Sequence, residues 1–185
     1  MLDLPNGSAS RASDIDDRGR VVLGDGRGAL TRFDLVRSSA PQGSLRLALG
    51  ERGMVTSVRL IPGREAALID DSAGVLYVWD FADAAVTRLG QTEQYVWALD
   101  IDAAGRRAYA AGRLDTATAL TVVDPQTGAR VFESPTRTPA YGVSVTQRGD
   151  AALFAVGTQD GSVEVWSEGR YEPLVESHQG EVPIM

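Results

Sequence analysis

Apolar residues occupy every second position in many short segments of this chain, and clusters of Gly, Asp and Pro separate the segments. Clear examples are TSVRLI at 56–61, VLYVWDF at 75–81, VWALDI at 96–101 and YGVSVT at 141–146. Such alternation predicts β-strands with one buried face. A 3.6-residue period does not persist anywhere for the roughly ten residues that a helix needs. The pattern therefore predicts an all-β chain.

Two series of markers repeat along the chain with the same period. A turn glycine recurs with spacings of 44, 42 and 44 residues, at Gly19, Gly63, Gly105 and Gly149. A residue at or near the end of a strand recurs with spacings of 46, 44 and 43, at Phe33, Trp79, Val123 and Trp166. Each unit has room for four strands. A four-stranded antiparallel unit repeated every ~40–45 residues is typical of a β-propeller blade.

The repeat predicts a single β-propeller segment over residues 1–185, with about four visible blades. We place these blades at residues 10–50, 54–92, 95–134 and 140–176, and the start of a further blade at 177–185.

The fourth unit, AALFAVGTQDGSVEVW, resembles a WD40 repeat, with a turn at Asp160 and Gly161 before a strand that ends in Trp166. The second unit resembles it through the pair Trp79 and Asp80. The third, ALTVVDPQTGARVFE, looks more like a YVTN-type propeller repeat. The resemblance implies a propeller that serves as a binding scaffold.

The match to the WD40 pattern is degenerate at the turn position. In the fourth unit an aspartate, Asp160, lies six residues before the strand-end marker Trp166. In the first three units the residues at that position are Arg27, Ala73 and Ala117. In the segment HQGEV, His178 resembles the histidine that opens a WD40 repeat. The resemblance implies that its partners in a fifth repeat would follow Met185.

Three assemblies remain open, because a repeat of this kind buries its sheet faces against neighbours on both sides. The chain is a fragment of a longer propeller, a half-ring that pairs with a second copy, or a closed ring of four blades. We favour the fragment.

Composition narrows the function classes. The net charge of −7 argues against a nucleic-acid partner and an anionic membrane surface. The absence of cysteine excludes disulfides and thiol chemistry. Because the first residues do not resemble a signal peptide and no ~20-residue apolar run occurs, we expect a cytoplasmic location. All eighteen basic residues are arginine, which indicates a GC-rich bacterial source.

Two segments invite a chemical interpretation that their context does not support. The acidic run from Ser13 to Asp17 lacks the spacing of a calcium loop. The run from Gly24 to Gly28 lacks the Lys-Ser/Thr pair of a phosphate loop and is interpreted as a hairpin. We therefore predict no catalytic residue, cofactor or metal.

The candidate contact residues lie where the innermost strands begin, since propellers commonly present binding loops there. Aromatic and arginine residues dominate interface hot spots. The predicted contact rim consists of Arg52, Gln94, Tyr95, Arg137 and Tyr141. Trp97, Trp79 and Trp166 are expected to pack between blades.

We expect a non-catalytic scaffold that binds a protein partner or another domain of a longer chain. The rival hypothesis is a propeller enzyme or a small-ligand sensor with a site at the central channel. Three or more carboxylates or amides converging on the axis would favour the rival.

Overall fold

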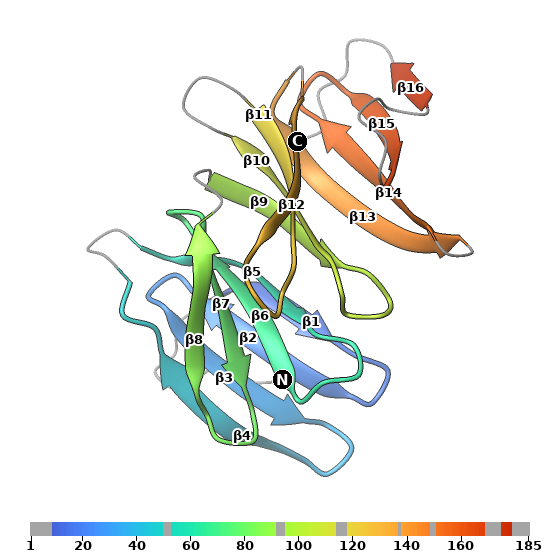
Figure 1. The fold of residues 1–185 in the computed structure, drawn as a ribbon. Helices are drawn as coiled ribbons and strands as arrows, with labels where there is room; N and C mark the ends of the chain where they lie inside the picture. Colours follow the sequence, from blue (N-terminus) through green and yellow to red (C-terminus); the bar gives the residue numbers. More distant parts are fainter. Residues whose placement is uncertain are drawn as a thin grey trace.

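The computed structural model describes residues 9–49, 53–91, 95–113, 118–136, 138–148, 151–168 and 175–178. These residues form sixteen β-strands and no helix. The strands make four antiparallel sheets, and each sheet consists of four strands that are consecutive in the sequence (Figure 1). The prediction of an all-β fold with propeller-like, four-stranded blades is confirmed.

The first sheet contains β1 (Ser10–Ile15), β2 (Arg20–Asp25), β3 (Ala29–Asp34) and β4 (Ser38–Arg46). The second contains β5 (Val55–Leu60), β6 (Ala66–Asp71), β7 (Val75–Asp80) and β8 (Val86–Gln91). The third contains β9 (Tyr95–Ile101), β10 (Ala108–Arg113), β11 (Thr118–Val123) and β12 (Arg130–Thr136). The fourth contains β13 (Ala140–Arg148), β14 (Ala151–Thr158), β15 (Ser162–Ser167) and β16 (Val175–His178).

The boundaries differ from the predicted blades mainly at the fourth strands. β12 continues to Thr136, and β16 continues to His178, two residues past the predicted end of the fourth blade. His178 is paired with Ser162, which continues the antiparallel ladder of the fourth sheet. Residues 179–185, the rest of the predicted further blade, lie outside the described residues.

The first strands of successive sheets lie side by side. β1 contacts β5, β5 contacts β9, and β9 contacts β13. The four inner strands therefore line one axis, and the other strands of each sheet extend away from it, as the blades of a propeller do (Figure 1).

The core consists of three apolar clusters, one between each pair of successive sheets. Trp79 is 2% exposed and lies in the cluster between the first and second sheets. Trp166 is 3% exposed and lies between the third and fourth sheets, where its ring stacks on Phe154. Phe33 is also buried. Each inter-sheet cluster removes the apolar faces of two sheets from water, which favours the stacked arrangement.

The predicted markers at the turns have two physical roles, a hydrogen bond and a left-handed backbone. Asp80 follows Trp79 at the end of β7, and its carboxylate accepts a hydrogen bond from the N–H of Ala82. Gly19, Gly63 and Gly105 have φ angles of 75°, 73° and 66°, a left-handed conformation that favours glycine. The period seen in the sequence thus reflects a repeated backbone requirement at the turn after the first three inner strands; the fourth marker, Gly149, lies outside the described residues.

No helix in the described residues is both long and apolar enough to span a membrane.

Candidate functional site

A β-bulge interrupts the start of every inner strand. In each case one residue is skipped in the pairing with the second strand of the sheet. The skipped residues are Arg11, Thr56, Trp97 and Tyr141. A bulge breaks the alternation of side chains and re-aims the extra residue, and bulges often lie beside functional sites. We call these four equivalent residues the bulge row.

The aromatic members of the bulge row contact one another. The rings of Trp97 and Tyr141 are stacked, with centroids 4.2 Å apart and an interplanar angle of 24°. Tyr95 packs edge-on against Trp97 at 5.8 Å. Tyr141 is 39% exposed, and Trp97 is half-buried. The alternation in the sequence favoured packing of Trp97 between blades. In the structure Trp97 does contact the next inner strand, through Tyr141, but it is the unpaired residue of a bulge and is only half-buried.

The structure brings together the two predicted contact residues that it describes. Tyr95 and Tyr141 lie on either side of Trp97. Arg52, Gln94 and Arg137 lie outside the described residues. Sequence reasoning missed Arg11 and Thr56, whose only signal is their spacing from Trp97 and Tyr141 along the repeat.

Arg11 extends the site toward the second sheet. Its guanidinium Nη1 lies 3.4 Å from the sulfur of Met54. A hollow of about 150 Å³ lies between the starts of the three inner strands β1, β5 and β9. Its lining is formed by Arg11, Met54, Val55, Thr56, Tyr95, Val96 and Trp97.

Thr56 differs from the other members of the bulge row because its side chain forms a hydrogen bond with a buried residue of the same sheet. Its hydroxyl donates to the Asp70 carboxylate at 2.8 Å. Asp70 is fully buried, and among the described residues its second carboxylate oxygen has no hydrogen-bond partner. Burial raises the pKa of Asp70 well above its ordinary value. At the position equivalent to Asp70, the first and fourth sheets carry Gly24 and Gly157, and the third carries Ala111.

The hairpins beside the bulge row are closed by aspartates. Asp25 Oδ1 accepts backbone N–H groups at positions 27 and 29, both at 2.8 Å. Asp71 Oδ1 does the same for positions 73 and 75, at 2.8 and 2.9 Å. Asp160 instead accepts from the Ser162 N–H and the Thr158 hydroxyl, and these bonds lower its pKa to about 2. The first two hairpins therefore use an aspartate two residues before the position that the WD40 resemblance indicates.

Three residues after each bulge, a second set of equivalent side chains lies on the inner strands. We call Asp14, Arg59, Asp100 and Ser144 the clasp row. Asp14 accepts the Leu60 N–H at 2.7 Å, and Asp100 accepts the Val145 N–H at 2.8 Å. Arg59 Nε lies 3.5 Å from the Asp100 carboxylate. Side chains of the clasp row thus connect each inner strand to the next.

A larger hollow, of about 610 Å³, opens at the clasp row. Four aspartates, Asp14, Asp16, Asp17 and Asp100, line it together with arginines. Burial raises the pKa of Asp14, although the Leu60 N–H and the Arg59 guanidinium act in the opposite direction. Among the described residues, no group of three or more His, Cys, Asp and Glu side chains is placed to hold a metal ion.

Comparisons with known proteins bear on the fold. No family model and no curated protein matches the chain. By contrast, 1372 chains of solved structures match, so the fold is common and does not by itself narrow the function. One is the crystal structure of Raptor from Chaetomium thermophilum, with a TM-score of 0.76 and 14% sequence identity. The match covers 96% of this chain and 17% of the Raptor chain, so the two share a propeller-like fold over a small part of the larger protein.

Proposed function

We propose that this chain is a non-catalytic, WD40-like propeller scaffold that binds a protein partner, or another domain of a longer polypeptide, at the bulge row. The observation that carries this proposal is the stack of Trp97 on Tyr141, which is held outside the apolar core by two bulges. Aromatic side chains lose little conformational entropy on binding and are enriched at interface hot spots.

The WD40-like assignment is supported by the fourth sheet. There Thr158, Asp160 and Ser162 form one hydrogen-bonded turn, and Trp166 lies buried at the end of the following strand. This is the arrangement that the resemblance of the fourth unit predicts.

The surroundings of the stack also suit a contact with protein. Arg11 is exposed at the near end of the site, and Tyr95 extends the aromatic surface. The predicted rim residues Arg52, Gln94 and Arg137 precede β5, β9 and β13 in the sequence, so we keep them as part of the proposed surface.

The test is quantitative capture with matched variants. The tagged wild-type chain, the double variant Trp97→Ala/Tyr141→Ala and a control double variant Ile15→Ala/Val36→Ala are each used as bait. Ile15 and Val36 are 61% and 78% exposed and lie away from the starts of the inner strands. Proteins captured by wild type are then purified and titrated against all three baits.

We expect a loss of at least about tenfold in affinity for the aromatic double variant and little change for the control. Equal binding by all three baits would contradict the proposed surface. Light scattering of the same samples gives the mass, which reports whether a second copy is the partner.

The hollow at the clasp row favours a second candidate function, the binding of a small polar ligand. This candidate is supported by the four aspartates that line the hollow, of which Asp14 and Asp100 lie on the inner strands β1 and β9. Two of them, Asp14 and Asp100, also accept backbone N–H groups. A thermal-shift screen with small polar compounds tests this candidate: stabilisation that disappears in Asp17→Ala would support it.

A further inference from the structure

Three exposed arginines lie together beside the bulge row. The Arg11 side chain lies over Gly26, where a Cβ would be 3.2 Å from Arg11 Nε. Arg27 follows in the same hairpin, and Arg46 Nε donates to the Arg27 carbonyl at 3.3 Å. In the described part of the chain, none of the three guanidinium groups forms an ion pair.

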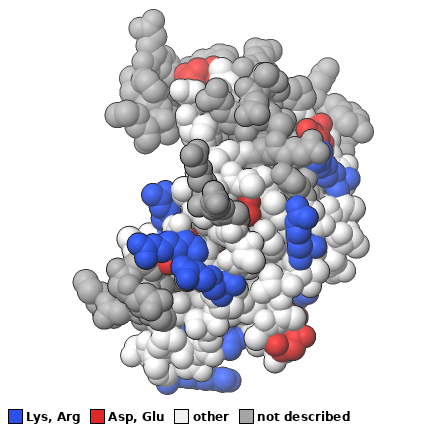
Figure 2. Space-filling view, turned by 90° about the vertical axis from the view of Figure 1, so that its left-hand side faces the viewer, with Lys and Arg blue, Asp and Glu red and all other residues white. Residues whose placement is uncertain are grey.

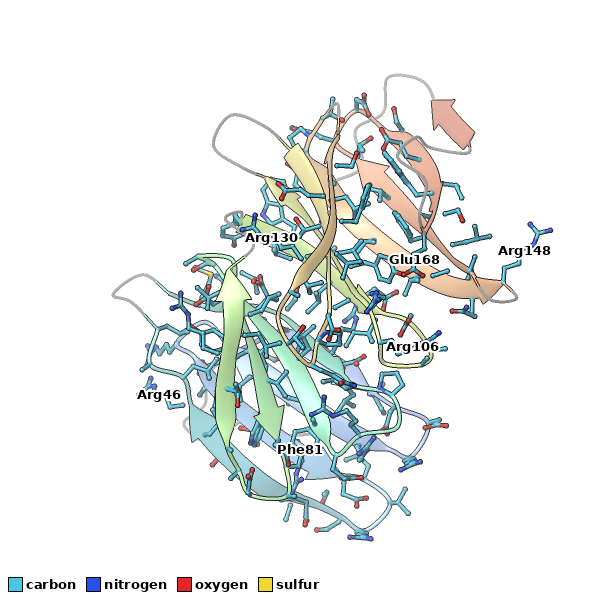
Figure 3. All side chains as sticks on the ribbon, viewed as in Figure 1. Arg46, Phe81, Arg106, Arg130, Arg148 and Glu168 are labelled. Carbon is cyan, nitrogen blue, oxygen red and sulfur yellow. The ribbon has the colours of Figure 1, made fainter. Side chains whose placement is uncertain are left out.

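By contrast, three arginines at the opposite end of the inner strands form ion pairs. Arg20, Arg59 and Arg107 each lie within 3.6 Å of a carboxylate. In Figure 2 several arginine side chains lie close together on one face, with a smaller acidic surface beside them, and Arg46 points toward this side in Figure 3. Within the described residues these arginines have no ion pair, so they give this part of a protein of net charge −7 a local positive charge.

The arginines border the hollow at the bulge row. The hollow is open to solvent, and its volume of about 150 Å³ leaves room for one side chain of about the size of benzene. Met54 and the ring of Trp97 supply apolar surface at the hollow, whereas Val55 and Val96 are fully buried beneath it. Arg11 belongs to both the hollow and the arginine cluster, so an apolar group in the hollow would lie directly beside a positive charge.

We infer that the segment bound at the bulge row is acidic and inserts one apolar side chain into the hollow, with carboxylates beside it on Arg11 and Arg27. This inference rests on the proposed function and adds the chemistry of the partner. Guanidinium groups form bidentate hydrogen bonds with carboxylates, and complementary charge selects among partners and speeds encounter.

A single-stranded nucleic acid is the competing ligand, because it too binds arginines and aromatic rings. The described surface offers three arginines in one cluster, and the molecule as a whole is acidic, so a phosphate backbone leaving the cluster would meet repulsion. A short acidic segment needs only the cluster and the hollow. The structure therefore favours the acidic peptide.

The test measures the fluorescence anisotropy of three labelled probes with the full 185-residue chain at low salt. The probes are Gly-Glu-Glu-Phe-Glu-Glu-Gly, the same peptide with Lys in place of Glu, and an oligothymidylate. The variants are Arg11→Glu and, as a matched charge reversal, Arg148→Glu. Arg148 lies at the far end of β13 from Tyr141 and points away from the molecule in Figure 3.

We expect the acidic peptide to bind at least about tenfold more tightly than the basic one. Arg11→Glu should weaken binding at least about fivefold, Arg148→Glu should not, and added salt should weaken it because exposed charges are screened. Equal binding of the two peptides, or tighter binding of the oligonucleotide, would overturn the inference. If the variant Trp97→Ala/Tyr141→Ala still fails to bind the captured proteins in that case, the proposed function remains supported. Only the inference that the bound segment is acidic is then wrong.

Discussion

The bulge row and the clasp row occupy the same four inner strands, only three residues apart, and differ in what their side chains contact. In the clasp row, Asp14 and Asp100 accept backbone N–H groups of the next inner strand, and Arg59 lies beside Asp100. In the bulge row, Trp97 and Tyr141 stack at the surface and Arg11 has no acidic partner among the described residues. The clasp row joins successive inner strands through polar contacts, whereas Arg11, Trp97 and Tyr141 of the bulge row are at least partly exposed to solvent.

The difference follows from backbone pairing. Regular antiparallel pairing holds the clasp row in register, so each carboxylate meets a backbone N–H of the neighbouring inner strand. At the bulges one residue is left unpaired, and its side chain turns out of the alternation. Two sets of side chains only about 10 Å apart along the same strands can thus serve different roles, one in stability and the other in binding.

The largest effect should come from Gly112→Ala, at the bulge that presents Trp97. A Cβ at Gly112 would collide with the carbonyl oxygen of Tyr95, which is backbone and cannot rotate away. We expect a loss of about 3 kcal/mol in the free energy of unfolding, measured by urea denaturation. The control is Gly157→Ala at the equivalent bulge, where nothing lies within 4 Å of the new Cβ. Equal losses in both variants would contradict this account of the bulge.

The clasp row should be the next most sensitive. Asp100→Ala leaves the Val145 N–H without its acceptor and Arg59 without its carboxylate. We expect a loss of about 2 kcal/mol in the free energy of unfolding. Asp17→Ala, in the same hollow but exposed, should change it by less than about 0.5 kcal/mol. Similar losses for the two would mean that the clasp contacts contribute little.

Arginines of the two ends should differ in their contribution to stability. Arg20 is 9% exposed and contacts the carboxylates of Asp16 and Glu65 at 2.6 and 2.7 Å. We expect Arg20→Ala to lower the free energy of unfolding by about 1.5 kcal/mol. Arg11→Ala should change it by less than about 0.5 kcal/mol, since Arg11 is exposed and has no ion pair with a described residue. A larger loss for Arg11 would show that it has a structural role.

Asp70 gives the smallest effect and a pH dependence with a definite sign. Burial raises its pKa well above 3.8, so between 3.8 and the raised pKa the folded protein holds a proton that the unfolded chain has released. The free energy of unfolding therefore falls as the pH rises through this window. Asp70→Asn replaces the carboxylate with an uncharged side chain and so removes the free-energy cost of burying a charge. We expect this variant to be more stable by about 1 kcal/mol at pH 8.

At pH 4 the advantage of Asp70→Asn should vanish, because Asp70 of the wild type is then protonated. Thermal unfolding followed by circular dichroism at the two pH values measures the difference. An equal gain at both values would show that the effect comes from packing near Thr56 and not from the charge.

Much of the fold was accessible from the sequence because it depends on local rules. Alternation predicted the strands, and the spacing of Gly19, Gly63 and Gly105 predicted the repeat, since each turn needs a left-handed residue. The bulge row was only half found. Tyr141 and Tyr95 were singled out as aromatic residues at strand starts, whereas Arg11 and Thr56 have no local feature that marks a bulge.

The sequence by itself determined the strand pattern, the period and the four-stranded unit, because each follows from neighbouring residues. Only the tertiary structure decided which side chains leave the sheets and which bind the next strand. The pairs that flank the bulges join residues 12 to 18 positions apart, and the clasp contacts join residues 41, 45 and 46 positions apart. A shift of one residue in that pairing turns Trp97 from a core residue into the centre of the proposed binding surface.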